Sequence, residues 1–138
     1  MFDSTTRVLV VDDMMTMRKI VMKICRELGL TDLTEAVNGA EAWQKITEAS
    51  PPFNLIISDW NMPQCTGLDL LKRVRGDKRY AHLPFVMVTA EAEQKQIVEA
   101  LTARVSSYIV KPFTTEMLKE KLTAVWTKQV EELKHKAV

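Results

Sequence analysis

The chain has 138 residues, which is the size of one domain with a single hydrophobic core. Hydrophobic residues make up 46% of it, and with only four Gly and five Pro the composition excludes disordered, collagen-like and low-complexity proteins. The 19 Lys and Arg balance 18 Asp and Glu, so the net charge of +1 provides no general attraction to nucleic acid or to anionic lipid. Two cysteines are too few for a disulfide scaffold and fit a reducing compartment.

Nothing in the sequence is typical of a membrane-targeting or membrane-spanning segment. The apolar run at residues 8–11, after a polar start, is too short for the core of a signal peptide. No stretch approaches the roughly 20 apolar residues that a membrane-spanning helix needs. We therefore expect a cytoplasmic protein that does not associate with a membrane.

The first half of the chain alternates short apolar runs with helical patterns. Residues 8–11 are continuously apolar, which is typical of a strand buried on both faces of a sheet. The next segment predicts a helix that ends at Gly29. The apolar face expected for this helix consists of Met17, Ile20, Val21, Ile24 and Leu28. Residues 33–36 predict a weak strand at a sheet edge, and residues 38–39 turn the chain into a second helix.

The second half repeats this alternation three times. Strands are predicted at 53–58, 85–88 and 108–110, each followed by a helix. The expected apolar faces of these helices are Leu68, Leu71 and Val74; Ile97, Val98 and Leu101; and Leu118, Leu122, Val125 and Trp126. Strict alternation of five strands with five helices predicts a single α/β domain with a parallel sheet and helices on both faces. We expect this domain to span 1–138, with a core of about 6–128 and a helical tail at 129–138.

A polar side chain follows four of the predicted strands at the point where each strand ends. Asp12 and Asp13 follow the first strand, Asp59 follows the third, Thr89 the fourth and Lys111 the fifth. Each of them alone has a simpler interpretation as a turn residue, a helix cap or a loop lysine. In a parallel sheet, however, the carboxyl ends of the strands share one edge, where ligands bind. Their joint placement therefore predicts a functional site.

The residue types at this edge indicate phosphoryl chemistry. Three carboxylates repel one another unless a cation neutralises them. Oxygen ligands without His or Cys favour Mg²⁺. A cation, the ammonium group of Lys111 and the hydroxyl of Thr89 would stabilise charge on a transferring phosphoryl group, and Asp59 would be the nucleophile that forms an acyl phosphate.

These segments resemble the receiver domain of bacterial response regulators, in particular its chemotaxis branch. The matching segments are 9–13, 16–18, 58–63, 87–92 and 110–114. The resemblance covers nearly the whole chain, and the runs at 59–63 and 89–92 are specific to the chemotaxis branch. It implies a five-stranded parallel sheet in the flavodoxin-like order 2-1-3-4-5, which is already known for this family.

The resemblance also implies roles for the acidic residues and their metal ion. Asp59 is similar to the aspartate that receives a phosphoryl group from a phosphohistidine on a sensor kinase. Asp13 resembles a direct ligand of Mg²⁺, and Asp12 resembles a ligand that acts through water. Asn61 corresponds to a ligand that acts through its backbone carbonyl.

A switch is implied as well. Thr89 resembles the hydroxyl that closes onto the phosphoryl group, and Lys111 resembles its ammonium partner. The bond between Lys111 and Pro112 is expected to be cis. Tyr108 resembles the aromatic residue that turns inward when the threonine moves. Phosphorylation would thereby bias an equilibrium between two loop arrangements.

The expected partners follow from the same resemblance. They are the histidine kinase of the chemotaxis system as phosphodonor, a flagellar motor switch protein bound by the fourth helix, fifth strand and fifth helix, and a phosphatase. We expect a monomer that binds no nucleic acid. The protein would be a phosphoacceptor that takes part in its own phosphorylation and dephosphorylation, not an enzyme that acts on an external substrate.

Several positions depart from the family pattern or suggest finer tuning. Arg104 and Val105 stand where Gly-Ala is usual, so we expect the fourth helix to end differently, because Arg adopts a left-handed cap less easily than Gly. Thr66 replaces a common Asp but can still cap the third helix. A further hypothesis is that Met14 and Glu91 tune the attack of water on the acyl phosphate.

Three alternative functions remain open at this point. A receiver can act as a phosphate sink or relay without contacting the motor. A Mg²⁺-dependent hydrolase with an aspartyl nucleophile would place that nucleophile after the first strand in an Asp-x-Asp pattern, whereas Asp12 and Asp13 are adjacent. A flavin protein would need a Ser/Thr/Gly loop at the same point, and these two carboxylates would repel the flavin phosphate.

Overall fold

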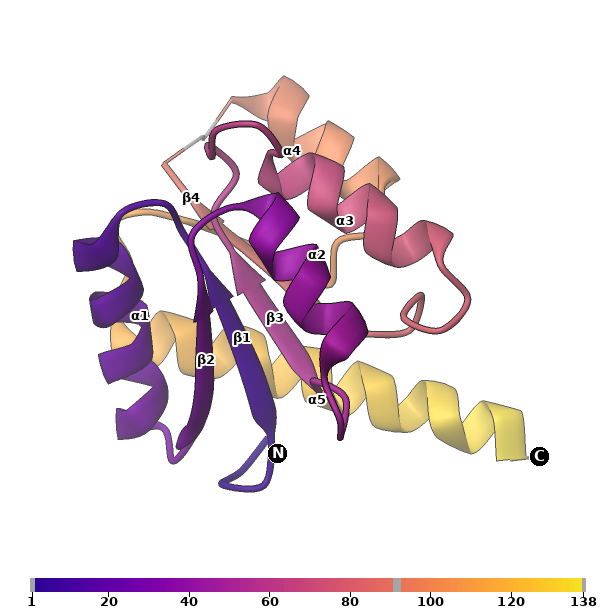
Figure 1. Ribbon diagram of the computed structural model, residues 1–138. Helices are drawn as coiled ribbons and strands as arrows, with labels where there is room; N and C mark the ends of the chain where they lie inside the picture. Colours follow the sequence, from indigo (N-terminus) through magenta and orange to yellow (C-terminus); the bar gives the residue numbers. More distant parts are fainter. Residues whose placement is uncertain (1, 91–92, 138) are drawn as a thin grey trace.

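The computed structural model describes residues 2–90 and 93–137, except for the side chains of 135–137, and these form a three-layer α/β fold (Figure 1). All strands of its sheet are parallel, in the order β2-β1-β3-β4-β5. The strands are β1 (Arg7–Val11), β2 (Asp32–Ala36), β3 (Leu55–Ser58), β4 (Phe85–Thr89) and β5 (Ser107–Val110). The predicted fold class and strand order are confirmed, including the edge position of β2.

The helices alternate with the strands and cover both faces of the sheet (Figure 1). They are α1 (Met15–Glu27), α2 (Gly39–Glu48), α3 (Gly67–Gly76), α4 (Gln94–Thr102) and α5 (Thr115–Ala137). One core cluster joins α1 and α5 to the sheet, with Val8, Val10 and Ile57 among its strand residues. The other joins α2, α3 and α4 to the opposite face, through Leu9 and Ile56 among others. Successive residues of a buried strand thus enter different clusters, which explains the uninterrupted apolar runs in the sequence.

The apolar faces of α1 and α4 are narrower than the sequence pattern predicts. Ile20 of α1 is 43% exposed, and Val98 and Leu101 of α4 are 52% and 59% exposed. In α4, whose residues are all described, only Ala100 is buried. Apolar periodicity marks a face that can be buried, but it does not establish that anything in the same chain covers it.

Gly29 ends α1 as predicted. It adopts a left-handed conformation with φ of 87°. Its N–H donates to the carbonyl of Arg26 (3.0 Å), and the N–H of Leu30 donates to that of Cys25 (2.9 Å). These two bonds form a Schellman motif, which satisfies carbonyl groups that the end of the helix leaves without partners.

The expectation that α4 would end differently is wrong. Arg104 itself adopts the left-handed conformation, with φ of 66°. Its N–H donates to the carbonyl of Leu101 (3.0 Å), and the N–H of Val105 donates to that of Ala100 (3.0 Å). The same Schellman motif therefore forms with an arginine at the position that favours glycine, at a conformational cost of about 1–2 kcal/mol.

The last helix continues beyond the sheet to Ala137 (Figure 1). Phe2, which is buried, packs edge-on against Trp126 with the ring centroids 5.2 Å apart, so the N-terminal segment is attached to α5. The predicted limits of the core and tail stay a prediction.

Among the described residues, no helix is both long and apolar enough to cross a bilayer.

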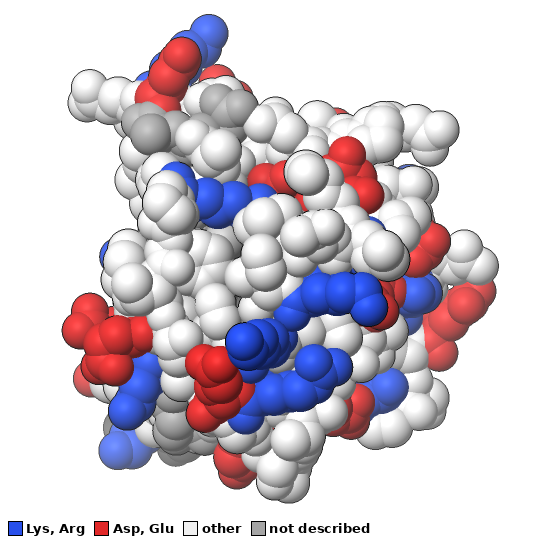
Figure 2. All heavy atoms as spheres, turned by 90° about the vertical axis from the view of Figure 1, so that its left-hand side faces the viewer, with Lys and Arg blue, Asp and Glu red and all other residues white. Residues whose placement is uncertain are grey.

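The surface on the α1 side carries charges of both signs. Lys and Arg side chains gather at the centre of this face, with Asp and Glu around them (Figure 2). Lys19, Lys23 and Arg26 are the exposed basic residues of α1. A mixed surface of this kind agrees with the net charge of +1.

The two helix ends predict stability changes of opposite sign. Gly29→Ala should lower the free energy of unfolding by about 1 kcal/mol, because a Cβ there meets nothing within 4 Å and the left-handed backbone alone is penalised. Arg104→Gly should raise it by about 0.5–1 kcal/mol, because relief of the left-handed strain outweighs the greater freedom of glycine in the unfolded chain. Urea unfolding would measure both, and a loss of stability in Arg104→Gly would contradict the strain argument.

Candidate functional site

The carboxyl ends of the strands bring the predicted site residues together. Val11 pairs with Ser58 across β1 and β3, so Asp12 and Asp59 leave adjacent strands side by side. Asp12, Asp13 and Asp59 each offer a carboxylate oxygen, and these oxygens lie within 4.8 Å of one another. Three acidic groups at this spacing can hold a metal ion through oxygen ligands.

Lys111 enters the same site from the far edge of the sheet. Its Nζ lies 3.1 Å from Oδ2 of Asp12 and 3.7 Å from Oδ1 of Asp59. The N–H of Lys111 donates to the carbonyl of Thr89 (2.8 Å), which fixes the start of the β5–α5 loop against the end of β4. The peptide bond between Lys111 and Pro112 is cis, as predicted.

The simpler interpretation of these polar residues as helix caps is wrong. The residue that precedes α1 is Met14, which makes no capping hydrogen bond through its side chain. Thr66 caps α3 in a reciprocal capping box with Asp69, as expected from its position. Glu93, not Thr89, precedes α4. Asp12 does act as a turn residue, because its Oδ1 accepts a hydrogen bond from the N–H of Met14 (2.9 Å).

Asp59 is a buried acid that faces both the ammonium group of Lys111 and the hydroxyl group of Thr89. It is 9% exposed, and its Oδ1 accepts a hydrogen bond from the N–H of Trp60 (2.8 Å). Burial raises the pKa of its carboxyl group above the ordinary value of 3.8, and the nearby charge of Asp12 also raises it. The ammonium group of Lys111, and to a smaller extent the Thr89 hydroxyl that donates to Asp59, act to lower this pKa. Lys111 and Thr89 therefore help to keep the buried carboxyl ionised.

Two further residues that support the site were not singled out from the sequence. The first is Gly67, the first residue of α3, which lies directly against the backbone of Asp59. A Cβ at this position would overlap the carbonyl oxygen of Asp59. The N–H of Gly67 donates to the carbonyl of Trp60 (2.9 Å). Only glycine allows this close approach, which sets the position of the loop after Asp59.

The second is Arg18 of α1, which is only 9% exposed although charged side chains usually face solvent. Its Nη1 donates to the backbone carbonyl of Asp12 (2.8 Å), and its Nε pairs with Glu35 (3.1 Å). Arg18 thus holds the backbone of one acidic residue while Glu35 balances its charge. Its presence in the matching segment 16–18 was the available signal.

The remaining predicted residues lie around this centre. Asn61 is exposed, two residues beyond Asp59 in the loop before α3. Tyr108 of β5 is half-buried, and its ring packs edge-on against Trp60 with the centroids 6.4 Å apart. Met14 is 59% exposed beside the acidic pair, and Glu91 lies outside the described residues.

This arrangement of fold and site matches one family of signalling proteins. The family model of the response regulator receiver domain covers residues 8–123, and the chain belongs to this family. CheY1 of Helicobacter pylori is 47% identical over 119 residues, which are 86% of this chain and 95% of the relative. CheY of Pseudomonas aeruginosa is 47% identical over 120 residues, with 87% and 95% covered.

A solved structure agrees with these relatives. CheY4 of Vibrio cholerae is 34% identical, covers 87% of this chain and 98% of its own, and superimposes with a TM-score of 0.78. The chain is a CheY-like chemotaxis response regulator whose phosphoacceptor site contains the acidic triad of Asp12, Asp13 and Asp59. It is a phosphoacceptor and not a classical enzyme, which decides against the hydrolase alternative.

The raised pKa of Asp59 predicts that Asp59→Asn stabilises the metal-free protein at neutral pH. Between the ordinary pKa of 3.8 and the raised pKa, the folded state binds more protons than the unfolded state, so the free energy of unfolding falls as the pH rises through this window. Above the window the wild type carries the full cost of the ionised carboxyl. The advantage of the variant should therefore be complete at neutral pH and disappear as the solution is acidified.

Urea unfolding in EDTA across this pH range would measure the effect. Asp77→Asn is the matched control, because hydrogen bonds from Arg79 hold the pKa of Asp77 below its ordinary value and its replacement removes a small stabilising interaction instead. An Asp59→Asn variant no more stable than Asp77→Asn at neutral pH would contradict the electrostatic description of the site.

Proposed function

We propose that Asp59 is the phosphoacceptor and that it takes the phosphoryl group from a phosphohistidine of the chemotaxis kinase. The observation that carries this proposal is the position of the Asp59 carboxylate, within 4.8 Å of two other acids, 3.7 Å from Lys111 Nζ and hydrogen-bonded to the Thr89 hydroxyl. In the transfer, an oxygen of Asp59 forms the new P–O bond while the P–N bond breaks and the imidazole keeps the electron pair. The carboxyl must be ionised for this attack, and Lys111 favours that state.

The donor set fits Mg²⁺. Carboxylate oxygens are the ligands that this hard cation prefers, and neither His nor Cys belongs to the cluster. We assign Asp12, Asp13, Asp59 and the backbone carbonyl of Asn61 to the metal. When bound, Mg²⁺ would neutralise negative charge on the carboxylates and on the phosphoryl oxygens. Arg18 would hold the Asp12 backbone in place for this role.

Phosphorylation would act as a switch through Thr89 and Lys111. The modification replaces one negative charge by about −1.5 to −2 and supplies three acceptor oxygens. The Thr89 hydroxyl, already donating to Asp59, would donate to a phosphoryl oxygen, and the Lys111 ammonium would pair with another. Movement of Thr89 at the end of β4 would then change the packing of Tyr108 on β5.

The output surface in this proposal consists of α4, β5 and α5, and its partner is a flagellar motor switch protein. Val98 and Leu101 support the assignment, because α4 presents both to solvent. We further propose that the protein acts as a monomer in the cytoplasm, that a phosphatase accelerates the loss of the phosphoryl group, and that no nucleic acid is bound. A phosphate sink or relay would share the phosphoacceptor chemistry but would not bind the motor protein.

Phosphorylation can be tested with a small phosphodonor and Mg²⁺, followed by intact mass measurement. We expect the wild type to gain the mass of one phosphoryl group and Asp59→Asn to gain none, because the nucleophilic oxygen is lost. EDTA should also prevent the gain. Asp77→Asn, which changes a carboxylate at the end of α3, should behave as the wild type does. Modification of Asp59→Asn would show that another group accepts the phosphoryl.

The switch can be tested by measuring the affinity of a labelled motor switch peptide by fluorescence anisotropy. Phosphorylation should increase this affinity by about 5- to 150-fold, the usual range of allosteric coupling. Thr89→Ala should remove most of the increase while still accepting the phosphoryl group, because the contact that reports the modification is missing. Thr47→Ala on α2 is the matched control. Full phosphorylation of the wild type without any change in affinity would instead favour a phosphate sink.

A further inference from the structure

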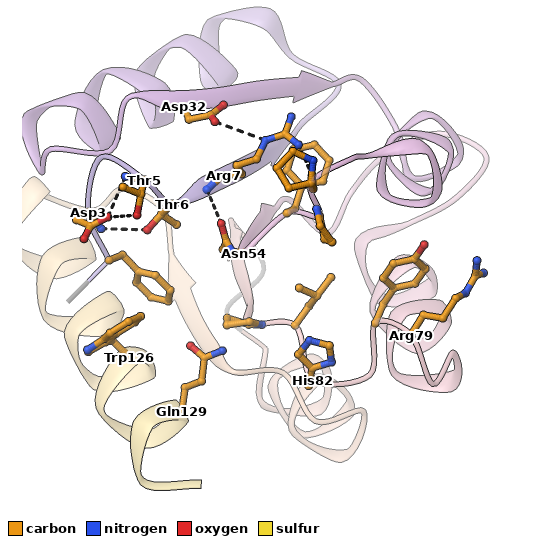
Figure 3. Close-up of a pocket in the computed structure, with 17 residues that line it drawn as sticks. Asp3, Thr5, Thr6, Arg7, Asp32, Asn54, Arg79, His82, Trp126 and Gln129 are labelled. Carbon is orange, nitrogen blue, oxygen red and sulfur yellow. Dashed lines mark hydrogen bonds and ion pairs between the residues drawn. The ribbon is translucent and has the colours of Figure 1, made fainter. Parts of the chain in front are cut away.

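Two cavities open at the amino ends of the strands, opposite the acidic site. The larger, of about 710 Å³, is lined by the N-terminal segment, the starts of β1 and β2, and α5 (Figure 3). The charge of Arg7 at its wall is already balanced, since Arg7 pairs with Asp32 (3.5 Å) and lies over the ring of Phe53. Arg7 therefore contributes no uncompensated positive charge to this cavity.

The smaller cavity, of about 470 Å³, adjoins the first and differs in charge. His82 and Gln129, both labelled in Figure 3, line both cavities. The smaller cavity lies between the end of α3, the α4–β5 connection and the C-terminal part of α5. Its charged lining consists of Arg75, Arg104, Lys128 and Glu132. Among the described residues, none of the three cations in this set forms an ion pair.

Arg75 fixes the geometry of this cavity. Its Nη1 donates to the carbonyls of Ala81 (3.1 Å) and Leu83 (2.6 Å), its Nε to that of Arg104 (2.9 Å), and its Nη2 to the hydroxyl of Ser106 (3.2 Å). Burial, followed by the charge of Arg104, lowers the pKa of Arg75 to about 10, so the group is still cationic at neutral pH. The neutral acceptors orient this guanidinium, and the charge of Glu132, which acts to raise this pKa, offsets only part of its positive charge.

Arg104 brings a second guanidinium to the same cavity at a conformational cost. It holds φ of 66°, where glycine would be strain-free, and its Nη2 reaches the carbonyl of Arg75 (3.4 Å). A non-glycine residue in this conformation is the kind of local strain that collects at binding sites. The glycine usual at this position would remove the charge.

The opposite wall is contributed by a part of the chain outside the family match. Val125, Lys128, Gln129 and Glu132 line the cavity, whereas the receiver domain model ends at residue 123. The cavity thus depends on the long α5 as well as on Arg104.

We propose that this cavity, walled by Arg75, Arg104 and Lys128, binds a small molecule that carries a phosphate group. Its volume is within the range of small-molecule sites. Three cations against the single acid Glu132 leave two positive charges in excess, which matches a phosphate dianion. Arg104 and Lys128 would contact the anion, and Arg75 would hold the loop and add its charge, while Glu132 would compete with the ligand. This site is separate from the phosphoacceptor edge.

Titration with inorganic pyrophosphate, followed by NMR chemical shifts, would test the proposal. The titration uses the full chain with Asp59→Asn in EDTA, at constant ionic strength, so that neither phosphorylation nor a metal complex contributes. We expect saturable shifts at the α4–β5 connection and at Lys128. Failure of this binding would leave the phosphoacceptor proposal untouched, because Asp59 is replaced throughout.

The variants should change the affinity in opposite directions. Arg104→Gly and Lys128→Gln should each weaken binding at least 10-fold, and Arg104→Gly should do so in a protein that is more stable, which separates lost binding from lost folding. Glu132→Gln should tighten binding several-fold. Lys121→Gln removes an exposed cation of α5 outside the cavity and should have no effect. Absence of saturable binding, or equal losses in Lys121→Gln and Lys128→Gln, would overturn the proposal.

Discussion

Repulsion among three carboxylates at one edge of the sheet is the constraint on which the site depends. A parallel sheet directs the ends of β1 and β3 to the same place, so the backbones of Asp12 and Asp59 lie side by side, and the Asp13 carboxylate lies close to both acids. Lys111 compensates only part of this charge. The folded protein therefore keeps an electrostatic cost that a bound cation can relieve.

The sequence predicted the elements and the site centre because both depend on local patterns. Buried parallel strands appear as uninterrupted apolar runs, and the residue after each run must lie at the carboxyl edge. The roles of Arg18 and Gly67 were not predicted, because they come from contacts between elements. The Arg18 guanidinium donates to the backbone carbonyl of Asp12, and the backbone of Gly67 in α3 lies against that of Asp59. The conformation of Arg104 was predicted wrongly for a similar reason, since bonds to Arg75 help to hold a backbone that local propensity disfavours.

The two ends of the sheet have opposite electrostatic character. Acidic side chains exceed the single ammonium group at the carboxyl edge, and guanidinium and ammonium groups exceed the single acid in the smaller cavity at the amino edge. The formal net charge of +1 does not reveal this difference, because the two excesses are equal in size and opposite in sign. β5 connects both ends: Lys111 follows it at one, and Ser106, bonded to Arg75, precedes it at the other.

The three tryptophans lie in three different parts of the molecule. Trp60 adjoins Asp59 and the ring of Tyr108, Trp43 packs against Tyr80 between α2 and the end of α3, and Trp126 contacts Phe2 on α5. Proteins that retain a single indole would consequently give separate optical signals from the acidic edge, the α2–α3 flank and the N-terminal attachment. Emission recorded from each would reveal whether an event at Asp59 stays local or spreads through the whole sheet.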